Sequence, residues 1–132
     1  MTLVIDASVA AQWLLQQQHS AAANALRKEQ GLIAPSLIAA EIGNAIWKAV
    51  RRGAVPRSEA LAALSAGLLP FETLVPNEDL HVQSLSLAID HGHPIHDCFY
   101  LALAEREAAP LVTADESMIA VARKAKIKVR RI

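Results

Sequence analysis

Thr2-Leu-Val-Ile-Asp6 is a short apolar run, rich in β-branched residues, that ends at an acid. A run without alternating polar positions is typical of a strand buried on both faces of a sheet. Comparable apolar runs recur along the chain at residues 32–34, 71–75, 111–113 and 127–132. Three of these stop at a proline or at Ala-Asp, so we expect a strand at each run.

The stretches between the apolar runs are rich in Ala and Leu with helical spacing. Residues 36–52 form one expected helix, which ends at Gly53 where a C-terminal cap fits. The other expected helices cover residues 9–30 with a break near His19, 57–68, 78–91, 97–109 and 116–126. Strands separated by helices of crossover length predict an α/β fold, a three-layer α/β/α sandwich with a central, mainly parallel sheet.

Composition and charge restrict the class of protein. The 132 residues, 53% of them hydrophobic, suit one buried core, so we expect a single domain over residues 1–132. The 13 basic and 13 acidic residues balance, which argues against nucleic-acid binding through a field spread over the whole surface. Any contact with RNA must then be local.

The single cysteine and the lack of a long apolar segment bear on cellular location. Cys98 can form neither an intramolecular disulfide nor, by itself, a thiolate metal site. Residues 1–6 lack the basic start of a signal peptide, and no later stretch approaches the ~18 uncharged apolar residues of a membrane helix. We expect a soluble, cytoplasmic protein with no membrane partner.

Several acids stand where a parallel sheet places functional groups. Ligands of open parallel sheets bind beyond the carboxyl ends of the strands, where Asp6 and Asp115 are expected. Those two acids, and Asp97 near a helix start, could equally be helix N-caps. Glu41 lies inside an expected helix among apolar residues, so its carboxylate must be partly exposed, paired or bound to metal. A solvated stripe shared with Lys48 is the alternative for Glu41.

The acids and the small polar residues near them suit a metal site. Neutral oxygens that can act as further ligands, or hold a carboxylate in place, stand within three residues of the acids at Ser8, Asn44 and Thr113. Carboxylates brought together repel one another and raise one another's pKa values, and a dication relieves that repulsion. Oxygen ligands without a Cys or His set favour Mg²⁺ or Mn²⁺ over Zn²⁺.

Four stretches, taken in order, resemble the PIN domain family and, within it, the VapC ribonuclease toxins of type II toxin–antitoxin systems. They are Val4-Ile-Asp-Ala-Ser8, Glu41-Ile-Gly-Asn-Ala45, His96-Asp-Cys-Phe-Tyr-Leu-Ala-Leu-Ala104 and Leu111-Val-Thr-Ala-Asp115. Together they span essentially the whole chain. His96 is a departure, because relatives often carry a tyrosine at that position.

The resemblance implies a metal-dependent endoribonuclease that acts as a toxin. Its catalytic and metal-binding acids would be Asp6, Glu41, Asp97 and Asp115, with support from Ser8, Asn44 and Thr113. Water activated with Mg²⁺ or Mn²⁺ would hydrolyse an RNA phosphodiester bond and leave 5′-phosphate and 3′-hydroxyl ends. Within this set we expect Glu41 to bind a second ion or to position the water. The resemblance also implies a homodimer and a cognate antitoxin bound in a groove between early helices.

Two other groups of residues have alternative interpretations. His91, His93 and His96 are close in sequence, but Gly92 and Pro94 predict a turn rather than a preformed zinc site. We expect this turn to be an exposed loop beside the active site. The basic residues near the last strand could protect a sheet edge or contact RNA phosphates, and Arg51-Arg52 could complement a helix end or contact phosphate.

Two other functions compete with the nuclease. A phosphoacceptor receiver needs an acid at the end of a middle strand, but residues 71–75 end at Pro76 without one. A catalytically silent PIN-like module that binds RNA or protein would have no need of the intact set of acids.

Overall fold

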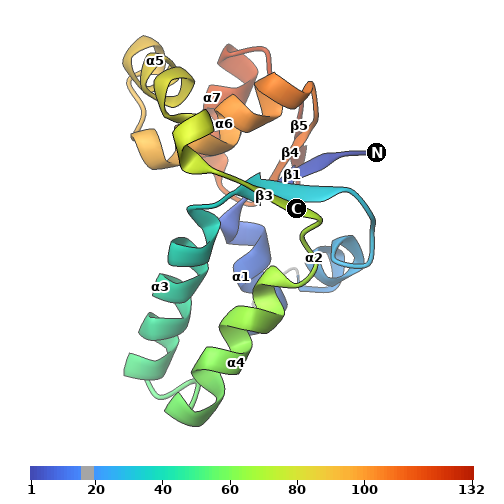
Figure 1. The fold of residues 1–132 in the computed structure, drawn as a ribbon, viewed down its shortest axis with the longest axis vertical. Helices are drawn as coiled ribbons and strands as arrows, with labels where there is room; N and C mark the ends of the chain where they lie inside the picture. The colour runs from blue at the N-terminus through green and yellow to red at the C-terminus, as the bar shows by residue number, and fades with distance from the viewer. Residues whose placement is uncertain (16–19) are drawn as a thin grey trace.

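A central parallel sheet organises the chain, whose computed structural model describes residues 1–15 and 20–132 (Figure 1). The strand order is β3-β2-β1-β4-β5, and every neighbouring pair runs parallel. The strands are β1 Leu3–Ile5, β2 Leu32–Pro35, β3 Thr73–Val75, β4 Leu111–Thr113 and β5 Val129–Arg131. Each strand lies on an apolar run of the sequence, so the predicted parallel sheet is confirmed.

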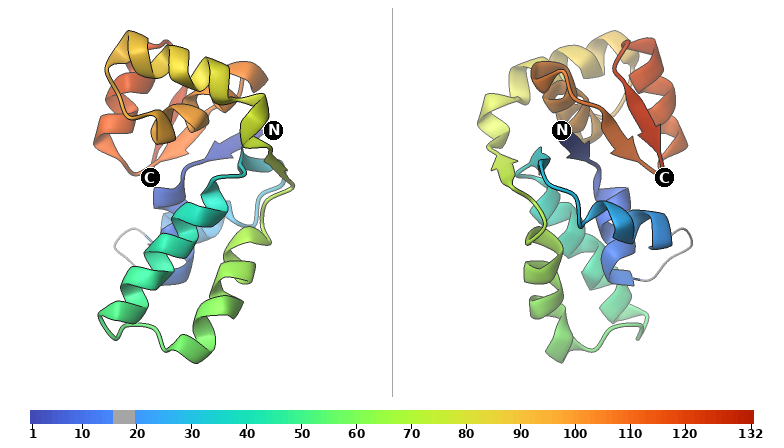
Figure 2. Two further views of the ribbon diagram at one scale, coloured as in Figure 1. Left: turned by 60° about the vertical axis from the view of Figure 1, so that its left-hand side comes forward. Right: turned by 90° about the vertical axis from the view of Figure 1, so that its right-hand side faces the viewer.

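Helices cover both faces of this sheet. They are α1 Ala7–Leu15, α2 Ser20–Leu26, α3 Ile38–Arg51, α4 Arg57–Leu68, α5 His81–His91, α6 Ile95–Glu107 and α7 Glu116–Lys124, with a 3₁₀ turn at Asn77–Asp79. Helices α1 to α4 lie on one side of the sheet and α5 to α7 on the other (Figures 1 and 2). The three-layer α/β/α sandwich is therefore confirmed. The break expected near His19 lies outside the described residues.

Helices α3 and α4 form a hairpin that extends away from the sheet (Figure 1). Gly67 allows α4 to approach α1 closely, because a Cβ atom at this position would come within 2.9 Å of Leu14 Cδ1. In the part of the chain that the structure describes, no helix is long and apolar enough to cross a bilayer.

The strand order reverses between β1 and β4. Strands β2 and β3 lie to one side of β1, whereas β4 and β5 lie to the other. Reversals of this kind open a crevice at the carboxyl ends of the two strands. The Asp6 N–H donates to the Val112 carbonyl at 3.0 Å, which ties the two ends together. Residues that follow β1 and β4 therefore border one crevice.

Two strands lie at the edges of the sheet. Because β3 is an edge strand, the lack of an acid after it does not bear on a receiver fold, and treating residues 71–75 as a middle strand was wrong. At the other edge, Arg131 of β5 pairs with Glu116 of α7. That pairing favours edge protection over phosphate contact for Arg131.

Candidate active site

Asp6 is a buried carboxylate at the point where the strand order reverses. It follows β1 directly and is 5% exposed. The hydroxyls of Ser8 and Thr113 each donate to its Oδ2 at 2.7 Å. Burial raises the pKa of Asp6, and the charge of Asp97 adds to the rise, although the hydroxyl bonds oppose it. The hydrogen bond from Thr113 ties the carboxylate to a second strand, so Asp6 is not simply an N-cap of α1.

Ser8 and Thr113 connect the ends of β1 and β4. Ser8 Oγ accepts a hydrogen bond from the Ala114 N–H at 3.1 Å, and Thr113 Oγ1 accepts one from the Asp115 N–H at 3.0 Å. The two hydroxyl oxygens lie 3.3 Å apart. Because both hydroxyls also bond Asp6, they set the orientation of its carboxylate.

Glu41 lies in the first turn of α3, nearer the helix start than the sequence predicted. Its Oε1 accepts a hydrogen bond of 2.7 Å from the hydroxyl of Tyr100, a fully buried residue of α6. Burial raises the pKa of Glu41, and the charges of Asp6 and Asp97 raise it further against the effect of the Tyr100 bond. The hydrogen-bond partner of Glu41 is therefore Tyr100, which argues against the alternative of a solvated stripe shared with Lys48.

A cavity of about 480 Å³ opens beside Glu41. Its lining includes Ser8, Asn44 and His96. Asn44 and His96 are exposed, so both are placed at the rim where a bound ligand could meet them. Asn44 is thus near the acids, as expected, but on the open side of the site.

Asp97 lies inside the first turn of α6 rather than at its N-cap. The helix begins at Ile95 because Pro94, with φ −55°, occupies the N-cap position. The expected helix start and the capping interpretation of Asp97 are therefore wrong. Instead, Asp97 Oδ2 lies 2.7 Å from His93 Nε2. The side chain of His93 is 11% exposed, so within the expected exposed loop this histidine departs from the expectation, whereas His96 is exposed.

Asp115 is the N-cap of α7, which is the alternative role that its position in the sequence suggested. Its Oδ1 accepts from the Ser117 N–H at 2.9 Å and the Ser117 hydroxyl at 2.7 Å, with the Met118 N–H at 3.5 Å. Burial opposes ionisation of Asp115, but these bonds and the charge of His93 outweigh it, so its pKa is lowered. Asp115 is therefore an ionised group, and the charge of His93, the neighbour of Asp97, reaches it.

The donor chemistry of the site fits a hard cation, but its geometry is not a finished metal site. Among residues 1–15 and 20–132, no three His, Cys, Asp or Glu side chains are grouped closely enough to hold one ion. The like charges of Asp6, Glu41 and Asp97 nevertheless act on one another. A dication would relieve that repulsion, and carboxylate oxygens suit Mg²⁺ or Mn²⁺. Binding would require the side chains to move together.

Two residues of the site were missed as functional residues in the sequence. Tyr100 bonds Glu41 across 59 residues of chain, a contact that no local pattern predicts. His93 stands four residues before Asp97, but it precedes the helix, so the pair forms through the turn between α5 and α6 and no helical spacing indicated it.

Known proteins resemble this chain in both sequence and structure. The sequence matches the PIN domain family over residues 3–124. Ribonuclease VapC3 of Pyrobaculum aerophilum is 33% identical over 121 residues, which cover 89% of this chain and 92% of that protein. Ribonuclease VapC1 of Mycobacterium tuberculosis is also 33% identical over 121 residues, with 89% and 88% covered.

Solved structures share the fold. The crystal structure of PAE2754 from Pyrobaculum aerophilum has a TM-score of 0.73 at 28% identity and covers 92% of this chain and 86% of that one. VapBC2 from Rickettsia felis, bound to a DNA fragment from its promoter, has a TM-score of 0.70 and covers 100% and 99%. At 16% identity, VapBC2 shows a common fold alone.

Proposed function

This chain belongs to the PIN domain family, and on that premise we propose that it is a metal-dependent endoribonuclease acting as the toxin of a toxin–antitoxin pair. The proposal treats residues 1–132 as a single PIN domain. Relatives of matching length are named as ribonucleases. Their names support an enzyme that hydrolyses RNA phosphodiester bonds.

One observation carries the proposal, namely the burial of Asp6 among like charges. Its carboxylate is 5% exposed, and its pKa is raised by burial and by Asp97. Glu41 is subject to the same field. Buried acids that raise one another's pKa cost stability unless a ligand neutralises them, which makes such a cluster a candidate for function.

The proposed ligands of Mg²⁺ or Mn²⁺ are Asp6, Glu41, Asp97 and Asp115. A bound ion would supply positive charge to a phosphodiester and to an attacking water. Glu41 would bind a second ion or hold that water. Among the described residues, hydrogen bonds to Glu41, Asp97 and Asp115 engage a single oxygen of each, so the other oxygen is available to a cation.

Other residues would orient the acids and meet the substrate. Ser8 and Thr113 fix Asp6, and the Tyr100 hydroxyl fixes Glu41. Asn44 stands at the rim of the cavity beside Glu41, where its amide can donate hydrogen bonds to RNA. These residues would place the phosphodiester at the acids rather than carry out proton transfer themselves.

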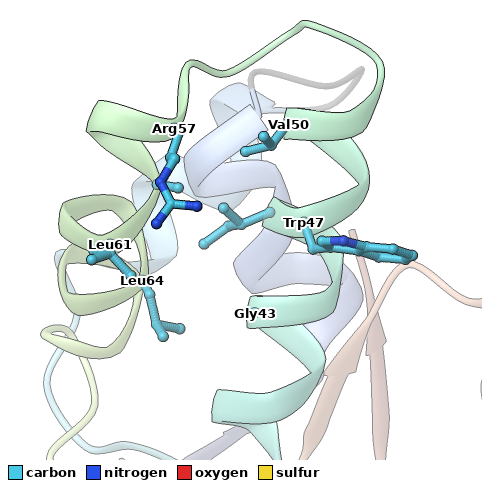
Figure 3. Close-up of a pocket in the computed structure, with 8 residues that line it drawn as sticks. Gly43, Trp47, Val50, Arg57, Leu61 and Leu64 are labelled. Atoms are coloured by element: carbon cyan, nitrogen blue, oxygen red, sulfur yellow. The ribbon is translucent and has the colours of Figure 1, made fainter.

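The partners of the proposed toxin are an antitoxin and a second copy of the chain. A cavity of about 290 Å³ lies between α3 and α4, and Figure 3 shows Arg57 and Leu64 of α4 facing α3 across it. The rest of its lining is mostly apolar, as an amphipathic antitoxin segment requires. Helix α5 exposes Val82 and Ile89, which a homodimer could cover.

A cleavage assay tests the nuclease directly. The purified, partner-free protein would be incubated with a defined structured RNA in Mg²⁺, in Mn²⁺ and in chelator, beside Asp6→Asn. Glu29→Gln is the matched control, because Glu29 is an exposed acid just before β2, at the opposite end of the sheet. We expect metal-dependent cutting by the wild type and Glu29→Gln, and none by Asp6→Asn. Cutting by Asp6→Asn at the wild-type rate would contradict the metal assignment.

A catalytically silent module that binds RNA or protein is the second candidate. The observation that favours it is the absence, in the described parts of the chain, of a ready-made group of three metal-binding side chains. The same assay separates the two functions. A folded wild-type protein that retards the RNA on a gel in every metal but never cuts it would support the silent module.

A further inference from the structure

Among the described residues, the side chain of His93 forms one hydrogen bond, and its partner is a proposed metal ligand. Its Nε2 lies 2.7 Å from Asp97 Oδ2, and the two side chains are 11% and 27% exposed. A carboxylate only accepts hydrogen bonds, so Nε2 is the donor. Because water is partly excluded from this pair, the contact is more than an exposed ion pair.

We propose that His93 is a positioning residue that fixes the Asp97 carboxylate for binding of Mg²⁺ or Mn²⁺, an inference that rests on the proposed function. The imidazole holds Oδ2 and leaves Oδ1 for the ion. Asp6 and Glu41 are arranged in the same way, since side-chain donors reach a single oxygen of each. His93 therefore holds one carboxylate oxygen of Asp97, as hydroxyl groups hold one oxygen of Asp6 and one of Glu41.

The backbone is restrained on both sides of His93. Gly92 ends α5 in the left-handed region with φ 59°, and the His93 N–H donates to the Ala88 carbonyl at 3.2 Å. Pro94 then begins the approach to α6 with φ −55°. These restraints hold the backbone of His93 just before the start of α6, and from there its ring reaches Asp97.

The position of His93 suits an outer partner better than a direct ligand. Its Nε2 is already directed at a carboxylate oxygen. Its charge also lowers the pKa of Asp115, so His93 stands near a second proposed ligand as well. Outer partners of ligating carboxylates fix the geometry of the site, and their loss typically weakens metal binding.

Binding of Mn²⁺, followed through the electron paramagnetic resonance signal of the free ion, tests the inference. His93→Phe keeps an aromatic ring and removes both nitrogens, whereas His93→Gln can return an amide N–H close to the position of Nε2. His93→Asn is a polar variant that is too short to reach Asp97. His81→Gln is the matched control, because His81 is exposed at the first residue of α5, at the other end of that helix. Circular dichroism melts show that each protein folds.

We expect His93→Phe and His93→Asn to weaken Mn²⁺ binding by ~10–100-fold. His93→Gln should recover most of the affinity, and His81→Gln should match the wild type. Equal or tighter binding by the two disruptive variants would overturn the inference. So would a His93→Gln protein that binds as weakly as they do, because the effect would then arise from packing rather than from the donor.

RNA cleavage by the same proteins separates this inference from the proposed function. A wild type that cuts RNA while His93→Asn keeps full Mn²⁺ affinity would overturn the role of His93 alone. A wild type that binds Mn²⁺, with weaker binding by His93→Asn, but cuts no RNA would overturn the nuclease alone. A wild type that binds no Mn²⁺ would overturn both.

Discussion

The carboxyl ends of β1 and β4 lie side by side, yet the acids that follow them are in opposite electrostatic states. Asp6, after β1, is 5% exposed, and burial raises its pKa with help from the charge of Asp97. Asp115, after β4, is also partly buried, but hydrogen bonds at the start of α7 and the charge of His93 lower its pKa. One acid resists ionisation and the other favours it.

This difference separates two ways of keeping a carboxylate at a strand end. Asp115 is stabilised by the amide groups of the helix that it caps, so it contributes to the fold without any ligand. Asp6 receives hydroxyl bonds but remains close to other acids. The account therefore predicts that Asp6 depends on a cation far more than Asp115 does.

The largest expected effect is that of Asp6→Asn on cleavage. Asn keeps the size of the side chain but removes the charge, so RNA cutting should fall by about 1000-fold or more while the fold is retained. Single-turnover cleavage in Mg²⁺ measures the loss, with circular dichroism as the check on folding. A rate within a few-fold of Glu29→Gln would show that Asp6 holds no essential ion.

Asp115 allows its two roles to be separated by a pair of variants. Asn is as good an N-cap as Asp, so Asp115→Asn should leave stability nearly unchanged but lower cleavage by about 10–100-fold. Asp115→Ala removes the cap as well and should cost about 1 kcal/mol in the free energy of unfolding. Urea unfolding and cleavage rates measure the two effects. Equal stability losses in both variants would mean that the charge, not the cap, stabilises α7.

Tyr100→Phe tests whether Glu41 needs its buried donor. The change removes the hydroxyl that bonds Oε1 and leaves a half-buried carboxylate without it, so we expect a loss of about 1–2 kcal/mol in stability. Cleavage should fall by about 10-fold, because Glu41 loses its orientation. In a Glu41→Gln background the same substitution should affect cleavage much less. Full additivity of the two substitutions would contradict the positioning role.

The smallest effect concerns pH. The raised pKa of Asp6 means that its contribution to stability is complete below its unfolded value of 3.8 and is lost as pH rises through the folded value. The lowered pKa of Asp115 has the opposite sign, so its contribution is lost as pH falls below 3.8. In chelator, wild type should lose more stability than Asp6→Asn as pH rises above 3.8. Urea unfolding at a series of pH values measures the free energy of unfolding of both proteins. The same dependence on pH in the two proteins would contradict this expectation.

Much of the fold could be predicted because its signals are local. Apolar runs such as residues 111–113 are too short and too uniform for surface strands, and they are strands in the structure. Glycine and proline mark several helix ends, as Gly53 does after α3. The start of α6 was misplaced because Pro94 fixes the N-cap position and Ile95 already has helical geometry.

The site was predictable in its acids but not in the residues that hold them. Asp6 and Asp115 follow strands, and this local position marked them as candidates. Their opposite electrostatic states depend on burial and on partners that folding supplies. Tyr100 reaches Glu41 only because α6 packs across the sheet from α3, and sequence spacing carries no trace of that contact.

A crystal structure of the Mn²⁺-soaked protein, with anomalous scattering recorded for manganese, tests the central claim most directly. The account predicts an anomalous peak at about 2.0–2.6 Å from carboxylate oxygens of Asp6 and Asp97, with Asp97 still held by His93. An ordered site with no peak at a saturating concentration of Mn²⁺, or a peak bound only at surface acids such as Glu29, would contradict it.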